Sequence, residues 1–269
     1  MGMCGDPSIT AIVPFYTYKK GGLFMSFEET LRKLNEMKLF GMARSFEEKR
    51  KTPEYKDVPP EEYLGYLVDE EYLYRKNNRL KRLLETAKLK IPQSCFEEID
   101  YRTPRSLAKN QVLGLQNTEW LESHQNVLIT GPTGVGKSYL ACALGQWACR
   151  MGYPTLYQRW PRLLGDLFAS KGDGGYLKHL DRLARVKLLI IDDFGINPLN
   201  ASERKDFLEI VEDRYMTGAT VITSQLPVKD WHEYIGEATL ADAICDRLFH
   251  VAHKLELKGE SMRKKKGKD

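Results

Sequence analysis

From about residue 94 onward, the chain alternates short apolar runs with longer segments in which apolar residues recur at helical spacing. The apolar runs predict five strands, at residues 127–130, 154–158, 187–192, 219–223 and 251–257. The intervening residues 138–151 and 201–216 have the period of helices. Apolar strands that alternate with helices are typical of a parallel sheet covered on both faces. We therefore expect an α/β domain with a five-stranded parallel sheet, whose ligand lies at the carboxyl ends of the strands.

The preceding residues, 26–90, have the pattern of helices alone. Two S-x-x-E capping boxes, Ser26–Glu29 and Ser45–Glu48, predict the beginnings of two helices. Residues 61–90 predict a longer third helix, which ends before Pro92. These residues predict a small all-helical domain in front of the sheet.

The predicted organisation has four parts. An irregular extension at 1–24, to which we assign no function, precedes a helical domain at 25–91. An α/β domain follows at 92–258, and a short segment with a basic tail at 259–269 ends the chain.

Composition excludes several classes of protein. The chain has 269 residues, of which 42% are hydrophobic, so it can bury a substantial core. Its five cysteines include no C-x-x-C pair, which favours unpaired thiols in a reducing cytoplasm over disulfides or a metal cluster. No apolar run approaches the roughly 18 residues of a membrane span, so no membrane partner is expected. The net charge of +4 is small, so any nucleic-acid binding requires local clusters of charge.

The most informative motif is G-P-T-G-V-G-K-S, which follows the predicted strand at 127–130 and begins a predicted helix. It fits the P-loop pattern, in which glycines let backbone N–H groups surround phosphates at a helix N-terminus. Lys137 can reach the β- and γ-phosphates, and Ser138 can hold Mg²⁺. We expect ATP and Mg²⁺ as cofactors. The predicted nucleotide contacts are Gly131, Pro132, Thr133, Gly134, Val135, Gly136, Lys137, Ser138 and Tyr139.

A second apolar strand ends in two carboxylates, Asp192 and Asp193. Downstream of a P-loop, the first is well placed to hold Mg²⁺, and the second can act as a general base toward the attacking water. The alternative is that two aspartates merely end a strand, which the P-loop upstream makes the weaker interpretation.

Later in the chain, two residues at a strand end and three arginines are candidates for catalysis. Ser224 and Gln225 end the strand at 219–223, where one of them could orient water or sense the γ-phosphate, although polar residues are common at strand ends. Arg247 and Arg263 are candidates to neutralise charge on the γ-phosphate, an effect worth about 10³–10⁵ in rate. Each arginine alone is more often a surface charge. Arg214 is a third candidate, with a structural or interface role the more expected.

Basic residues cluster in three places: the helix at 75–90, the segment at 159–185 and the C-terminal tail. Such clusters are the usual footprint of phosphate-backbone binding, but a solvated helix face is the alternative. The predicted DNA contacts are Arg75, Lys76, Arg79, Lys81, Arg82, Arg182, Lys264 and Lys265.

These pieces, in this order, resemble an AAA+ ATPase of the helicase-loader clade, and within it the IstB family of helper proteins of insertion-element transposition. The resemblance covers about residues 25–264. It rests on Leu31-Arg32-Lys33-Leu34, Leu39-Phe40-Gly41-Met42-Ala43, the P-loop, Ile191-Asp192-Asp193-Phe194-Gly195, Ile222-Thr223-Ser224-Gln225-Leu226-Pro227, Asp246-Arg247-Leu248 and Gly259-Glu260-Ser261-Met262-Arg263. The P-loop is common to many families, whereas the Ser-Gln-Leu-Pro and Gly-Glu-Ser-x-Arg segments are more specific for this one.

The resemblance implies a role for each matching residue. Lys137 and Ser138 match Walker A, and Asp192 matches the Walker B magnesium aspartate. Asp193 stands where most AAA+ proteins have the catalytic glutamate, and Ser224 or Gln225 stands at sensor 1. Arg247 matches the arginine finger that acts on a neighbour's ATP, and Arg263 matches sensor 2. Residues 159–187 are long enough for an extra helix that initiator and loader relatives have.

Three functions remain open. The first is a transposition helper that forms homo-oligomers on double-stranded DNA with ATP, deforms the target and recruits or stimulates the transposase of the same element. The second is a replicative helicase loader, which has the same ATPase core. The third is a nucleotide switch with little turnover, because Asp193 is one methylene shorter than glutamate.

Overall fold

The computed structural model describes residues 26–51 and 58–262. The chain divides into two compact units, Met1–Arg75 and Lys76–Asp269, which are described in turn. The predicted extension at 1–24 lies outside the described residues.

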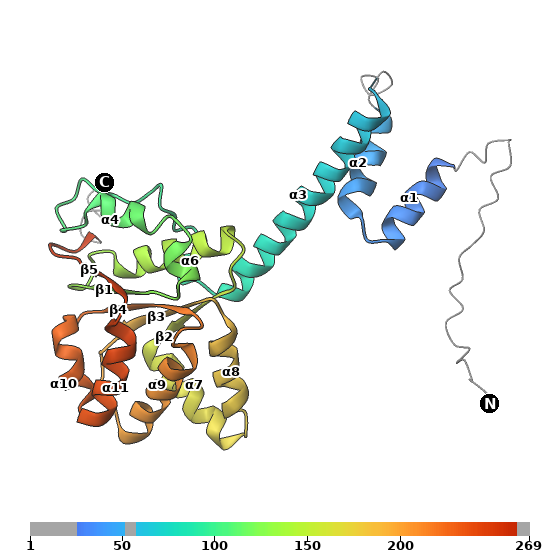
Figure 1. Cartoon of the computed structure of the whole chain (residues 1–269). Helices are drawn as coiled ribbons and strands as arrows, with labels where there is room; N and C mark the ends of the chain where they lie inside the picture. Colours follow the sequence, from blue (N-terminus) through green and yellow to red (C-terminus); the bar gives the residue numbers. More distant parts are fainter. Residues whose placement is uncertain (1–25, 52–57, 263–269) are drawn as a thin grey trace, which may run out of the picture. The chain divides into compact units, whose positions relative to one another are not determined.

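The described residues of the first unit are helical, as predicted. It contains α1 (Phe27–Glu36), α2 (Phe40–Arg50) and the first part of α3 (Pro60–Ala87) (Figure 1). The Ser26 side chain accepts a hydrogen bond of 3.2 Å from the Glu29 N–H, so the predicted N-cap of α1 is confirmed.

The predicted cap at Ser45 is wrong. Helix α2 begins five residues earlier, at Phe40, and Ser45 is buried in its interior. The N-terminus of α2 is instead stabilised by a carboxylate from α3: Glu71 Oε2 accepts hydrogen bonds from the N–H groups of Gly41 (2.7 Å) and Met42 (3.2 Å). A carboxylate supplied from 30 residues away satisfies the free N–H groups of a helix as well as a local cap does, and leaves no signal in the local sequence.

The second unit contains the remainder of the secondary structure. In chain order these elements are α4 (Lys109–Gly114), α5 (Glu119–Glu122), β1 (Asn126–Thr130), α6 (Lys137–Arg150), β2 (Thr155–Arg159), α7 (Trp160–Gly172), α8 (Tyr176–Arg185), β3 (Leu188–Phe194), α9 (Ala201–Arg214), β4 (Ala219–Ser224), the 3₁₀ turn η2 (Val228–Asp230), α10 (Trp231–Ile235), α11 (Ala238–Phe249) and β5 (Ala252–Glu256). The extra helix expected within residues 159–187 is present, since both α7 and α8 lie there.

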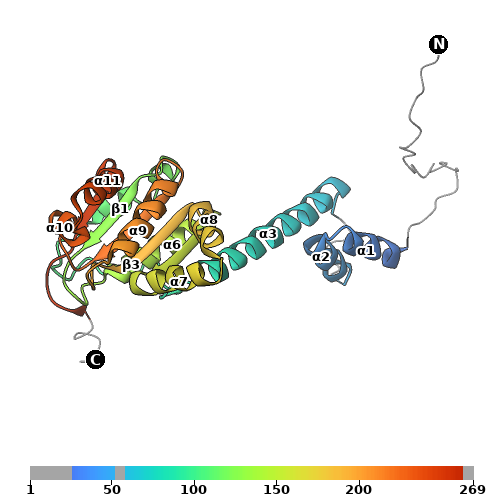
Figure 2. The same cartoon turned by 90° about the horizontal axis from the view of Figure 1, so that it is seen from below.

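The five strands form one parallel sheet in the order β2-β3-β4-β1-β5, which confirms the predicted fold class. Helices α4 and α6 cover one face, and α7 to α11 cover the other (Figures 1 and 2). The order places β4 between β1 and β3. The carboxyl ends of β1, β4 and β3 therefore lie side by side at one edge of the sheet.

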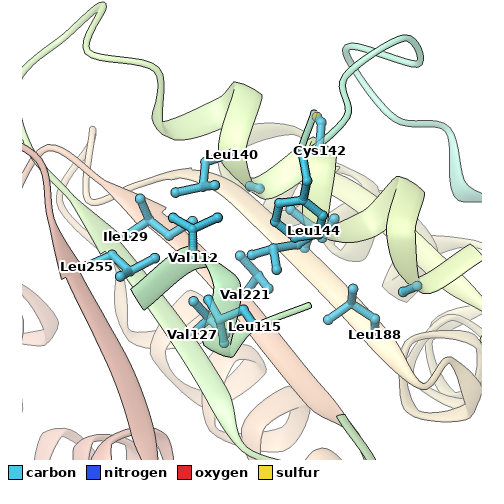
Figure 3. Packing of buried hydrophobic residues seen from close by; sticks show 14 of the residues in the cluster. Val112, Leu115, Val127, Ile129, Leu140, Cys142, Leu144, Leu188, Val221 and Leu255 are labelled. Atoms are coloured by element: carbon cyan, nitrogen blue, oxygen red, sulfur yellow. The ribbon is translucent and has the colours of Figure 1, made fainter. Parts of the chain in front are cut away.

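The side chains of successive strand residues point alternately to the two faces of the sheet, because the strand is pleated. Val127 and Ile129 of β1 face the core under α6, whereas Leu128 between them belongs to the core on the opposite face. Figure 3 shows the first core, in which Leu140 and Leu144 of α6 lie over strand residues such as Val221. Burial on both faces explains why these strands are apolar throughout rather than alternating.

Among the described residues, no helix is long and apolar enough to cross a membrane.

Candidate nucleotide site

The P-loop connects β1 to α6 through three glycines with positive φ angles. Gly131, Gly134 and Gly136 have φ of 144°, 87° and 100°. Residues with a Cβ disfavour this region, so the loop conformation explains the glycine pattern. Lys137 begins α6, and its Nζ donates to the backbone oxygens of Gly131 (2.7 Å) and Pro132 (2.8 Å). The ammonium group is thus held across the mouth of the loop.

The segment after β5 packs against the outside of this loop. Leu257 N–H donates to Thr130 O (2.8 Å), and Met262 N–H donates to Gly134 O (2.9 Å). A Cβ at Gly134 would clash with the side chain of Ser261. The P-loop is therefore clamped by the chain immediately before Arg263, which itself lies outside the described residues.

Asp192 lies at the centre of a hydrogen-bond network and is fully buried. Ser138 Oγ donates to its two carboxylate oxygens at 2.8 and 2.9 Å, and Thr223 Oγ1 and Tyr157 OH donate as well. Lys90 Nζ forms an ion pair of 3.1 Å with Oδ2. The structure thus brings together Ser138 and Asp192, the two residues predicted to hold a metal.

Opposing effects act on the pKa of Asp192. Burial raises it, but hydrogen bonds from Thr223, Tyr157 and Ser138 and the charge of Lys90 lower it, and the net pKa lies below the ordinary value. The carboxylate is therefore ionised at neutral pH, as a metal ligand must be.

Asp193 occupies a β-bulge. The register of β3 against β4 shifts between Ile191 and Phe194, and Asp193 has a φ of 64°. In a regular strand, adjacent side chains point to opposite faces. The bulge changes the direction of Asp193, so that both aspartates lie near Lys90, whose Nζ is 4.0 Å from Asp193 Oδ2. Arg159 Nε forms a second ion pair with this oxygen, at 2.8 Å.

The two sensor candidates differ in what their side chains contact. Ser224 is buried, and its hydroxyl donates to Phe194 O (2.7 Å) and accepts from Leu226 N–H (3.0 Å). Gln225 is exposed toward the P-loop, where its Oε1 accepts a hydrogen bond of 2.8 Å from Thr133 Oγ1. The geometry favours Gln225 over Ser224 as the residue that meets a nucleotide.

A cavity of about 640 Å³ opens beside these residues. It is lined by the predicted residues Thr133, Gly134, Gly136, Lys137, Ser138, Tyr139, Asp193 and Gln225, and also by Lys90, Ile91, Glu98, Ile99, Asp100, Arg105, Arg159, Ile196 and Met262. The lining combines apolar side chains, such as Ile91 and Ile99, with charged ones, such as Lys137 and Asp193, which suits a nucleoside attached to phosphates. Three of the predicted nucleotide contacts, Gly131, Pro132 and Val135, are not in the lining.

The oxygen donors present suit Mg²⁺. No group of three or more His, Cys, Asp or Glu side chains in the described part of the chain forms a metal cage. Mg²⁺ ordinarily binds one or two protein oxygens together with phosphate oxygens and water, so Ser138 and Asp192 suffice beside a triphosphate.

Arg247 lies away from this cavity. Its Nε pairs with Glu212 at 2.5 Å, and its backbone oxygen accepts a hydrogen bond of 3.4 Å from Asn126, the first residue of β1. The P-loop begins after the last residue of that strand, roughly 16 Å away at about 3.3 Å per residue. Arg247 therefore lies at the opposite end of β1 from the phosphate loop of its own chain.

Arg214 has a structural role. It is buried, and its guanidinium donates to the backbone oxygens of Leu183, Val186 and Ala219 and to Thr220 Oγ1. These bonds join the end of α9 to α8 and β4.

The sequence also matches a known protein family. The model for the family described as IstB-like ATP binding protein matches residues 32–269. The chain belongs to this family.

Relatives agree with the assignment to the IstB-like family. A Sinorhizobium fredii protein described as an insertion sequence ATP-binding protein is 48% identical over 235 residues, which are 87% of this chain and 96% of the relative. An insertion sequence ATP-binding protein of Pseudomonas fluorescens is 43% identical over 203 residues, 76% of this chain and 88% of the relative.

Two solved structures share the fold. DnaI superimposes with a TM-score of 0.54 at 19% identity, over 66% of this chain and 93% of DnaI. The replication initiator DnaA bound to AMPPCP and single-stranded DNA gives 0.50 at 18% identity, over 66% of this chain and 55% of DnaA. These structures show that the fold is that of AAA+ proteins, and the family assignment makes the chain an ATP-binding ATPase.

The predicted DNA contacts are distributed over both units. In the first, Arg75 pairs with Glu71 at 2.6 Å. In the second, Arg79 donates to Gly152 O at 2.9 Å. The other described members of the set are exposed: Lys76, Lys81, Arg82 and Arg182. Lys264 and Lys265 lie outside the described residues.

Four residues of the site are not predicted by sequence motifs. Lys90 and Arg159 are grouped in the sequence with the basic clusters, yet both pair with the strand-end aspartates. Tyr157 and Arg105 carry no motif at all. The one usable signal is position: Arg159 is the last residue of β2, the strand adjacent to β3, and Tyr157 lies two residues before it.

Proposed function

We propose that the protein is an ATP-dependent regulator of transposition, in which ATP bound at the P-loop drives assembly of several copies on duplex DNA. The assembly then recruits or stimulates the transposase of the same element. The observation that carries the proposal is the separation of Arg247 from the phosphate loop of its own chain.

The residues around the P-loop support the chemical step. Lys137 and the P-loop N–H groups bind the β- and γ-phosphates, and Ser138 and Asp192 would hold Mg²⁺, which would offset phosphate charge. Asp193 accepts a proton from a water that Gln225 orients. The water oxygen bonds to the γ-phosphorus, the bond to the β–γ bridging oxygen breaks, and ADP leaves with the electron pair. Arg159 must release Asp193 for this step, which makes slow basal turnover the natural expectation.

The position of Arg247 supports assembly. An arginine at the far end of β1 cannot reach the γ-phosphate of its own chain, but it can reach that of an adjacent copy. Arg247 then completes the ATP site of a neighbouring copy. Because ATP bound between two copies contacts both of them, it binds the assembled state more tightly than a single copy and so favours assembly.

The charge distribution supports duplex DNA as the surface for assembly. Lys76, Arg79 and Arg82 are separated by three and six residues on α3, so they lie within one broad face of the helix. Contacts of this kind bind the phosphate backbone without reading sequence, as a variable target requires. Several copies that each contribute contacts can offset the roughly 1–6 kcal/mol that bending of a target costs.

A transposase is the proposed partner because the relatives are named as insertion sequence proteins. A helicase loader is the alternative, supported by a fold shared with DnaI. In that case the helical N-terminal region would dock on a helicase.

Fluorescence anisotropy of a labelled random duplex tests the proposal. We expect tight binding with a non-hydrolysable ATP analogue, weak binding with ADP, and a steep fall in affinity as salt rises, because bound phosphates release counterions. Equal affinity with both nucleotides, or a flat salt response, would contradict it. A second experiment separates helper from loader. The protein is passed over immobilised transposase of the element and over an immobilised replicative helicase. Retention by the helicase alone would favour the loader.

A further inference from the structure

Arg105, in the loop that precedes α4, is a buried cation beside the P-loop. Its relative exposure is 7%. Nη1 donates to Val135 O at 2.9 Å, and Nη2 donates to Asp100 O at 2.7 Å. The side chain thus ties the phosphate loop to the segment that follows Ile99.

The backbone of Arg105 is also fixed. Its oxygen accepts a hydrogen bond of 2.9 Å from Lys258 N–H, and a Cβ at Gly259 would lie 2.6 Å from the oxygen of Pro104. The same C-terminal segment holds the P-loop through Met262. The C-terminal segment therefore holds both the backbone of Arg105 and the P-loop that its guanidinium contacts.

The hydrogen bond to Val135 O determines the direction of a phosphate-facing group. In a trans peptide, the carbonyl of Val135 and the N–H of Gly136 belong to one rigid plane and point in opposite directions. Nη1 would lie 2.5 Å from a Cβ at Gly136, so the guanidinium packs directly against this turn. By holding the carbonyl, Arg105 sets the orientation of the N–H that a P-loop presents to phosphate.

Arg105 forms no ion pair within 4.0 Å among the described residues, although the charge of the nearby Asp100 stabilises it in part. The carboxylate of the adjacent Asp100 is used by Arg102 N–H (2.8 Å) and Thr103 Oγ1 (2.6 Å). Arg105 Nε is buried without a hydrogen-bond partner in the described part of the chain. Burial lowers the pKa of the guanidinium, which reflects the cost of a buried charge. A phosphate group in the adjoining cavity, which Arg105 lines, would supply the missing opposite charge.

We propose that Arg105 is a positioning residue of the P-loop and a buried counter-charge for the phosphates of a nucleoside di- or triphosphate. The proposal deepens nucleotide binding at this site and does not depend on assembly on DNA.

The test compares Arg105→Met with Arg105→Lys, and uses Arg102→Met as a matched control, because Arg102 is exposed three residues earlier and does not line the cavity. Dissociation constants for ADP, ATP and pyrophosphate are measured by calorimetry, with adenosine as a competitor. No DNA is present, so failure of the DNA proposal cannot produce the result.

We expect Arg105→Met to weaken ADP, ATP and pyrophosphate alike by about tenfold to a hundredfold, the range of a lost charged hydrogen bond. Adenosine affinity should stay unchanged. Arg105→Lys should recover part of the loss, because an ammonium keeps the charge but lacks the planar fork. Arg102→Met should bind as the unchanged protein does.

Retention of ADP affinity within threefold in Arg105→Met would overturn the proposal. An equal loss for adenosine and pyrophosphate would also overturn it, since it would indicate general collapse of the cavity. If circular dichroism shows that Arg105→Met does not fold, Arg105→Lys decides: a folded protein with at least a fivefold loss of pyrophosphate affinity supports the proposal, and unchanged affinity refutes it.

Discussion

Arg159 Nε lies 2.8 Å from Oδ2 of Asp193, and this ion pair joins the ends of the adjacent strands β2 and β3. The carboxylate proposed as the general base is therefore already engaged by a cation. The guanidinium occupies the oxygen that would receive the proton from water. The strand-end contact thus provides a structural reason for slow basal hydrolysis that is independent of the length of the aspartate side chain.

Replacement of Arg159 by Gln is expected to raise basal turnover by about two- to fivefold. The Arg159 side chain is 54% exposed, and an ion pair of such exposure is worth about 0.2–1 kcal/mol. Phosphate release at saturating ATP gives the rate, with Arg162→Gln, an exposed arginine of α7, as the control. A slower Arg159→Gln enzyme with normal ATP affinity would mean that the arginine assists the reaction instead.

Asp193→Asn should bind ATP with unchanged affinity but lose turnover, because the amide cannot accept the proton. A loss of about a hundredfold or more matches the contribution of a general base. Single-turnover hydrolysis measures the chemical step separately from product release. Turnover at the original rate would place the base elsewhere in the site.

Tyr157→Phe removes one hydrogen bond to the buried carboxylate of Asp192. At pH 7 the free energy of unfolding should fall by about 1.5–3 kcal/mol, the range for a hydrogen bond to a charged group. The folded pKa of Asp192 lies below its unfolded value, so its ionised form contributes stability that is complete above the unfolded pKa of about 3.9 and is lost as pH falls through the folded pKa.

The difference between the original protein and Tyr157→Phe should therefore shrink below about pH 4. Urea unfolding at pH 7, 5 and 3.5 measures it. The matched control is Tyr153→Phe, whose partly exposed hydroxyl donates to Glu122 at 2.6 Å and should matter by less than about 1 kcal/mol. A difference that stays constant with pH would show that Asp192 is not the group stabilised.

Sequence patterns predict the parts of the fold that depend on local chemistry. The apolar strands and the three P-loop glycines follow from burial on two faces and from positive φ angles. The convergence of Ser138 with Asp192 follows from a general rule, because parallel strands place their carboxyl ends at one edge.

Features that depend on distant partners leave no such pattern. The cap of α2 comes from Glu71, which is why the local S-x-x-E pattern at Ser45 is misleading. The pairing of Arg159 with Asp193 depends on the order of the strands and on a bulge, neither of which the strand sequences specify. A basic residue in sequence can equally face solvent, DNA or a carboxylate until the fold brings its partner near.

Assembly with a shared site predicts complementation. Arg247→Ala and Asp193→Asn should each be inactive alone. In a mixture, the Arg247 of an Asp193→Asn copy can face the intact Asp193 of its neighbour, so activity should return in part. Phosphate release across mixing ratios measures this, with each variant at the same total concentration as the control. No recovery at any ratio would indicate that Arg247 does not act on a neighbour.

Sedimentation velocity on a defined duplex tests the central claim most directly, that ATP at Lys137 controls assembly on DNA. The unchanged protein with a non-hydrolysable ATP analogue should sediment with the duplex as a complex of several copies. With ADP, the unchanged protein should sediment as small species apart from the DNA. The Lys137→Ala variant should do the same with either nucleotide. A complex of the same size under all of these conditions would contradict the account.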